Sequence, residues 1–132
     1  MTKENLYVWA CDYSENTGEG KLAHLFLEKK NLNKKFNIVL NKKRNYFKYS
    51  APFLGILYCW SKSLKNHKVC YLNYLPLWNF LIFIFLPKKT ILGPITGGAN
   101  YTKTLNFNFI VRDKLFPIFY KISCFFLEKK FK

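Results

Sequence analysis

Residues 6–27 read LYVWACDYSENTGEGKLAHLFL and contain three successive patterns. The apolar run from Leu6 to Cys11 is typical of a buried strand. The polar, glycine-containing stretch SENTGEG follows it, and from Glu19 to about Leu32 the pattern becomes helical. A strand, a glycine loop and a helix in this order indicate the first unit of an α/β fold.

The rest of the chain continues this alternation. Strand-like runs span 36–40, 69–75 and 90–95, and helical patterns span 51–64, 77–86 and 114–130. Residues 102–112 fit either a strand or an ordered loop. Apolar strands separated by helices predict an α/β fold with a doubly wound, mostly parallel sheet of about four strands flanked by helices. No linker is evident, so residues 1–132 are predicted to form a single Rossmann-like lobe.

The apolar positions predict which side of two helices faces the core. In the first helix we expect Leu22, Leu25 and Phe26 to be buried. In the last helix Asp113 is the expected N-cap and Pro117 falls in the first turn. The expected core face of that helix consists of Leu115, Ile118, Phe119, Ile122, Phe125 and Phe126.

The charge is strongly basic, because 22 Lys and Arg residues stand against 7 Asp and Glu residues and give a formal net charge of +15. Such a balance favours an anionic partner, either a membrane surface or a nucleic acid. The abundant Lys, Asn, Phe, Ile and Tyr all have A/T-rich codons, however, and only Arg44 and Arg112 are arginines. Codon bias therefore accounts for the charge equally well, and nucleic acid is not expected as a partner.

Residues that carry chemistry are sparse. No carboxylate lies between Glu28 and Asp113, which excludes a paired-carboxylate site built from the middle of the chain. His24 and His67 have no neighbours at metal-ligand spacing, so no metal site and no cofactor are expected. The cysteines are widely spaced within apolar runs, which predicts reduced thiols; they are Cys11, Cys59, Cys70 and Cys124.

Residues 69–87, VCYLNYLPLWNFLIFIFLP, carry no charge and resemble a membrane segment. Asn73, Pro76 and Asn79 interrupt the run, and its unbroken apolar part is far shorter than the roughly 20 residues of a spanning helix. We therefore expect a buried strand, a turn and a short helix, with a membrane span as the alternative. The N-terminus has no secretory signal pattern, which predicts a cytoplasmic location, open to peripheral association with the inner membrane face.

The loop TGEGKLA, residues 17–23, carries the sharpest motif. Gly18, Gly20 and Ala23 satisfy the dinucleotide fingerprint G-x-G-x-x-A, but the loop before Gly18 is long for the tight turn that this motif needs. Asn41 and the basic residues 42–44 stand where an acidic ribose ligand is expected. An NADP-binding protein is thus an alternative, and a plain strand-to-helix turn is another.

A second glycine pair, Gly97 and Gly98, follows the run 90–95. Loops at the carboxyl ends of parallel strands share one rim of a sheet and border its ligand crevice. We therefore expect residues 17–20 and 97–98 to meet across one cleft. Asp12 and Glu19 flank this cleft and are the candidates for proton transfer.

Two stretches, WACDYSENTGEGKLAHLFL (9–27) and NYLPLWNFLIFIFLPKKTILGPITGG (73–98), resemble the N-terminal half of bacterial glycosyltransferases of the GT-B type. These enzymes have two Rossmann-like lobes and build lipopolysaccharide and other surface glycans. The resemblance implies transfer of a sugar from a nucleotide-sugar donor to a surface-glycan or lipid-linked acceptor.

The resemblance also implies roles for the loop residues. Gly18, Glu19 and Gly20 would lie near the donor's diphosphate, with Gly97 and Gly98 beside them. Asp12 or Asn16 would lie near the acceptor. In this family a C-terminal lobe binds most of the nucleotide sugar, and this sequence has no such lobe. We therefore expect the chain to be inactive or incomplete alone and to need a separate C-terminal lobe. The alternative function is a basic, non-catalytic module that binds a membrane surface or a nucleic acid.

Overall fold

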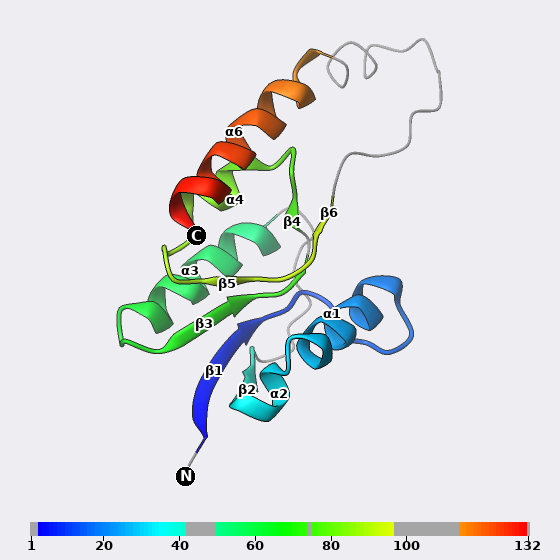
Figure 1. Cartoon of the computed structure of the whole chain (residues 1–132), viewed down its shortest axis with the longest axis vertical. Coiled ribbons are helices and arrows are strands. Elements are labelled where there is room, and N and C mark those ends of the chain that lie inside the picture. The colour runs from blue at the N-terminus through cyan, green and yellow to red at the C-terminus, as the bar shows by residue number, and fades with distance from the viewer. Residues whose placement is uncertain (1–2, 42–49, 74, 97–113, 132) are drawn as a thin grey trace.

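The sheet at the centre of the molecule contains four strands, all parallel (Figure 1). The structure is a computed structural model that describes residues 3–41, 50–73, 75–96 and 114–131. The strands are β1 (Glu4–Trp9), β2 (Phe36–Leu40), β3 (Lys68–Tyr71) and β5 (Ile91–Leu92), in the order β2-β1-β3-β5. Two further short strands, β4 (Leu75–Pro76) and β6 (Ile95–Thr96), pair with each other in parallel.

Helices cover both faces of the sheet, which confirms the doubly wound α/β prediction. The helices α1 (Gly18–Lys29) and α2 (Leu32–Lys35) lie on one face, and α3 (Ala51–Ser63) and α4 (Phe80–Phe85) lie on the other (Figure 1). The last helix, α6 (Phe116–Lys130), packs mainly against α4. Each face has its own apolar core, and β1 contributes to both because its side chains alternate between them.

The first helix ends earlier than the sequence pattern predicts. Asn31 adopts a left-handed backbone conformation with φ 53°, and this residue separates α1 from α2. Asparagine tolerates that conformation better than most residues because its short polar side chain bonds locally.

The predicted core face of α1 is only partly correct, because Phe26 packs against the core as expected but the buried side of the helix is rotated about its axis. Gly20, Ala23 and Leu27 are buried, whereas Leu22 and Leu25 are 40% and 49% exposed. The small residues face inward because the helix lies close to the chain after β1. The hydrophobic pattern alone does not reveal this, since glycine and alanine carry little apolar signal.

The predicted core face of α6 is also only partly correct. Phe119 packs against Phe80, with ring centroids 5.0 Å apart, but Leu115, Ile118 and Phe125 are exposed. The buried position is instead Ser123, whose hydroxyl donates to the Leu77 carbonyl oxygen at 2.6 Å. Among the described residues the helix has apolar side chains on most sides and packs mainly against α4, so part of its apolar surface is exposed.

Residues 69–87 are divided among β3, β4 and α4 rather than forming one helix. Across the described parts of the chain, no helix combines the length and apolar character needed to cross a bilayer. The strand-or-loop segment 102–112, the N-cap candidate Asp113 and the basic residues 42–44 lie outside the described residues.

The four cysteines are free thiols, as predicted, and they differ in accessibility. Cys124 is exposed, whereas Cys59 and Cys70 are fully buried. Burial raises the pKa of Cys59 to about 12 and raises that of Cys70 as well. A raised thiol pKa lowers the fraction of reactive thiolate near neutral pH.

We therefore expect iodoacetamide, applied to the native protein at about pH 8, to alkylate Cys124 first and to spare Cys59 and Cys70. Peptide mass spectrometry after a time course measures this order, and unfolding in urea is expected to equalise the rates. Equal labelling of Cys59 and Cys124 in the native protein would contradict the described packing.

Candidate functional site: the carboxyl edge of the sheet

The carboxyl ends of β1 and β3 lie side by side, because these strands are neighbours and run parallel. The chain leaves β1 toward α1 on one face, and it leaves β3 toward α4 on the other face. The connections that follow β1 and β3 therefore lead to opposite faces of the sheet, which makes the space between these two strand ends the topological switch point. In open α/β sheets ligands bind outside the carboxyl ends of the strands at such a switch point.

A buried amide holds the two strand ends together. Asn73, only 3% exposed, follows β3; its Oδ1 accepts a hydrogen bond from the Cys11 amide at 2.9 Å, and its Nδ2 donates to the Asp12 carbonyl oxygen. Asn41 acts in the same way from β2, where its Oδ1 accepts from the Ala10 amide at 2.8 Å. The chain that leaves β1 is therefore fixed from both neighbouring strands.

Side chains within the loop between β1 and α1 hold it in shape. The Asp12 carboxylate accepts hydrogen bonds from the Ser14 amide at 2.9 Å and from the Thr17 hydroxyl at 2.6 Å. Thr17 is the N-cap of α1, and its Oγ1 accepts from the Gly20 amide at 3.1 Å. Asp12 thus orients the residue that caps the helix, a positioning role that sequence reasoning did not assign to it.

The two glycines at the start of α1 are required for different reasons. A Cβ atom on Gly20 would lie 1.9 Å from the Ser14 carbonyl oxygen, so this position must be glycine for the loop to pack on the helix. A Cβ atom on Gly18 would have no atom within 4 Å. Gly18 is exposed at the N-terminus of α1, and the described structure contains no contact that demands a glycine there.

The remaining predicted loop residues lie around the helix start. Glu19 is half-buried in the first turn of α1, where its negative charge interacts favourably with the positive end of the helix dipole. Asn16 is exposed. The His24 ring stacks on Tyr13 with centroids 3.9 Å apart, so it is not the fully solvated residue that its position on the polar face suggests. Burial, followed by the charges of Glu28 and Glu15, raises the pKa of Tyr13.

The chain that follows β5 also reaches the carboxyl edge. The Gly93 amide donates to the Tyr71 carbonyl oxygen at 2.8 Å, and a Cβ atom on Gly93 would lie 1.9 Å from the Leu72 carbonyl oxygen. The segment 93–96 therefore begins, at Gly93, beside the carboxyl end of β3. Gly97 and Gly98 lie outside the described residues, so their meeting with residues 17–20 stays a prediction.

Sequence reasoning did not identify the role of Asn41 and Asn73 in holding the strand ends together. Each is a polar residue directly after an apolar strand, and that position was the available signal. Within the described ranges, no group of three or more His, Cys, Asp and Glu residues could hold a metal ion. What this edge offers is an ordered loop, a helix N-terminus and the carboxylates of Asp12 and Glu19.

Comparison with known proteins assigns no family: no family model, no curated protein and no solved structure matches this chain. The geometry of the carboxyl edge and the chemistry of its residues are therefore what indicate a function.

The Asn73 hydrogen bonds lead to a stability prediction. Asn73→Leu leaves the partly buried Cys11 amide and Asp12 carbonyl without the bonds that Asn73 provides, and we expect a loss of about 1–3 kcal/mol in the free energy of unfolding. Urea denaturation measures this loss. The control is Asn37→Leu, which removes the exposed hydrogen bond from Asn37 to Asn5 Oδ1 (2.9 Å) and should cost less than about 1 kcal/mol. Equal losses in the two variants would contradict the role of Asn73.

Proposed function

We propose that the chain is the N-terminal, acceptor-side lobe of a GT-B type glycosyltransferase, which transfers a sugar from a nucleotide sugar to a surface-glycan or lipid-linked acceptor. The observation that carries the proposal is the open N-terminus of α1 at the β1–β3 switch point, led by Gly18. The sequence resemblance in residues 9–27 covers this loop, and the parallel, doubly wound sheet is the architecture that such a lobe needs.

The start of α1 has the chemistry that a diphosphate requires. The amides of Gly18 and Glu19 have no hydrogen-bond partner among the described residues, whereas Thr17 already satisfies those of Gly20 and Lys21. Unpaired amides and the positive end of the helix dipole attract an anion. Because no side chain stands on Gly18, a phosphate group has room to approach the backbone.

In this proposal the backbone amides of the loop donate hydrogen bonds to the leaving diphosphate and stabilise the charge that develops on it during transfer. Donors that are already in position before the reaction stabilise this charge most effectively. Asp12 and Asn73 keep the loop in position. Asp12 and Glu19 are the carboxylates proposed for proton transfer near the acceptor, although both oxygens of Asp12 already accept hydrogen bonds from Ser14 and Thr17. A separate C-terminal lobe supplies most of the donor contacts.

The test is a ¹⁵N NMR titration of the protein with uridine diphosphate, guanosine diphosphate and inorganic pyrophosphate. We expect the Gly18 and Glu19 amides to shift with a Kd on the order of 1 mM, since one lobe supplies only part of the contacts. Gly18→Val should abolish the shifts without changing the urea midpoint greatly, because its side chain fills open space at the helix start.

The control is Glu15→Val, at an equally exposed position of the same loop, which should keep the binding or strengthen it by removing a negative charge. Gly20→Val is unsuitable as a probe, because its clash with Ser14 would disturb the loop itself. Unchanged Gly18 and Glu19 amides with all three ligands would contradict the proposed role of the loop.

A second candidate function, binding to an anionic membrane surface, is favoured by the outer face of α3. Phe53, Leu57, Trp60 and Leu64 follow one another at intervals of four, three and four residues and are 43–75% exposed. Residues at these intervals lie on one side of a helix. The helix carries no acidic residue, and the exposed Lys65 follows the last residue of the stripe. Exposed apolar side chains on a helix without acidic residues are compatible with a position in the membrane interface.

Sedimentation with phosphatidylglycerol vesicles, compared with pure phosphatidylcholine vesicles, tests this candidate. Leu57→Asp should weaken binding to the anionic vesicles at least about tenfold, because it removes one buried leucine from the interface. Leu25→Asp, at a similarly exposed leucine of α1, is the control and should bind like the unchanged protein. Equal binding by the two variants would show that net charge alone drives association.

A further inference from the structure

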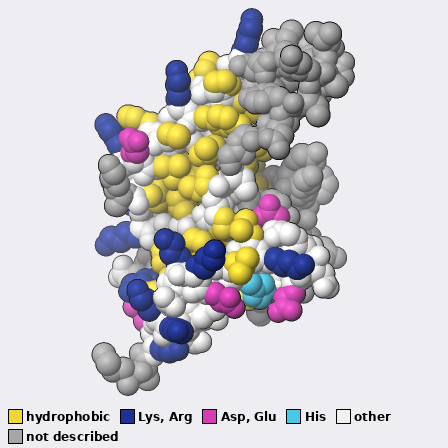
Figure 2. Space-filling view, turned by 45° about the vertical axis from the view of Figure 1, so that its right-hand side comes forward, with side chains coloured by type: hydrophobic (Ala, Val, Ile, Leu, Met, Phe, Trp, Pro, Cys, Tyr) yellow, Lys and Arg dark blue, Asp and Glu magenta, His cyan; other side chains and the backbone are white. Residues whose placement is uncertain are grey.

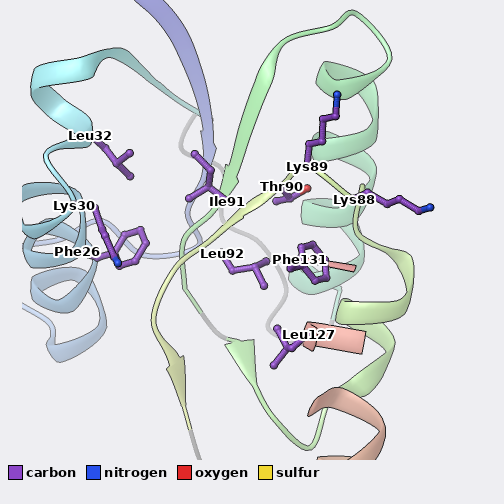
Figure 3. Close-up of a pocket in the computed structure, with 10 residues that line it drawn as sticks. All are labelled: Phe26, Lys30, Leu32, Lys88, Lys89, Thr90, Ile91, Leu92, Leu127 and Phe131. Atoms are coloured by element: carbon purple, nitrogen blue, oxygen red, sulfur yellow. The ribbon is translucent and has the colours of Figure 1, made fainter. Parts of the chain in front are cut away.

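A hollow of about 620 Å³ opens along β5, the edge strand of the sheet, and it lies away from the carboxyl-edge loop. Lys30 lines the hollow and directly follows the C-terminal end of α1. In a helix of this length, that end lies about 18 Å from Gly18 at the N-terminal end. Six of the ten residues that line the hollow are apolar, namely Phe26, Leu32, Ile91, Leu92, Leu127 and Phe131, and the other four are Lys30, Lys88, Lys89 and Thr90 (Figure 3).

The shape of the hollow follows from the sheet edge. Phe26 and Leu32 come from the helices on one face, and Leu127 and Phe131 come from the C-terminal end of the chain on the other face (Figure 3). β5, which is only two residues long, contributes Ile91 and Leu92 to the hollow. Apolar side chains from both sides of the sheet therefore line the hollow along this edge strand.

Lysines form the rim of this apolar hollow. Lys30, Lys88 and Lys89 line it, and no acidic residue does. Lys88 also faces Lys130; burial and then the charge of Lys88 lower the pKa of Lys130. The one ion pair among the described residues joins Lys68 to Glu4 on the sheet, so the rim lysines have no carboxylate partner there. Figure 2 shows hydrophobic side chains gathered across the middle of one face, with lysines and a few acidic side chains around its margins.

We propose that this hollow binds a single-chain anionic amphiphile, with the alkyl chain between Phe26 and Phe131 and the anionic head on Lys88 and Lys89. Its volume is in the range of small-molecule sites, and its lining combines apolar side chains with lysines. The inference depends on neither proposed function, because it uses neither the Gly18 loop nor the outer face of α3.

Two other occupants fit the hollow less well. A strand added from another protein would pair with only two residues of β5, which is short for a stable strand pair. A second copy of the chain would bring a net charge of +15 against another +15 and place lysines against lysines. An anionic head group instead relieves the crowding of like charges at the rim.

The experiment is isothermal titration calorimetry with dodecyl phosphate below its critical micelle concentration. We expect one site per chain, affinity roughly tenfold lower for decyl phosphate because two fewer methylenes are buried, and no heat with inorganic phosphate. Dodecyl maltoside, which has the same chain and no charge, should bind about tenfold more weakly or worse.

Matched variants locate the site. Phe131→Ser and the double variant Lys88→Glu/Lys89→Glu should each weaken dodecyl phosphate binding about tenfold or more. The controls are Phe125→Ser, at an exposed phenylalanine outside the hollow, Lys65→Glu/Lys114→Glu, with the same change of charge, and Leu57→Asp on α3. All three controls should keep the affinity.

Four results would overturn the proposal. They are no binding of dodecyl phosphate, equal binding of inorganic phosphate, equal losses in the Phe131 and Phe125 variants, and a dimer in sedimentation that Phe131→Ser dissociates. The last result would assign the hollow to a second copy of the chain.

Discussion

The hydrogen bonds of Asn73 join chain segments 62 residues apart, and the arrangement of the carboxyl edge depends on them. Parallel strands have no hairpin to connect them, so their ends need contacts of another kind. Asn73 supplies these between β1 and β3, and Asn41 supplies a similar one between β1 and β2. Because the loop after β1 starts from these bonds, the position of Asp12, the cap at Thr17 and the direction of α1 all follow from them.

Close approach between layers is the second constraint, and glycine provides it at three positions. Gly20 lets α1 meet the loop at Ser14, Gly55 brings α3 against Trp9 and Tyr71, and Gly93 brings the chain after β5 against Leu72. A side chain at any of the three would collide with a neighbouring atom. Gly18 differs because no described atom lies within 4 Å of the place where its Cβ would be. We propose that a glycine stands there because a ligand approaches the backbone closely.

The surface combines lysines with exposed apolar side chains in two separate places. One is the outer face of α3 and the other is the hollow beside β5. Large apolar side chains outside the core are typical of binding surfaces when they lie together. We propose that both places bind lipid-like anions, a role in which the net charge of +15 favours association whatever the origin of the lysines.

The sequence by itself determined the order of strands and helices, the parallel α/β class and the free thiols, because apolar runs and breaks in them are local signals. It also placed Asp12, Gly18 and Gly20 in one loop. Only the tertiary structure decided which sides of α1 and α6 are buried, since that rotation depends on contacts such as Gly20 with Ser14 and Ser123 with Leu77. The same holds for Asn73 and for the hollow beside β5, because each is formed by residues that are distant in the sequence and meet only after the sheet and its helices have packed.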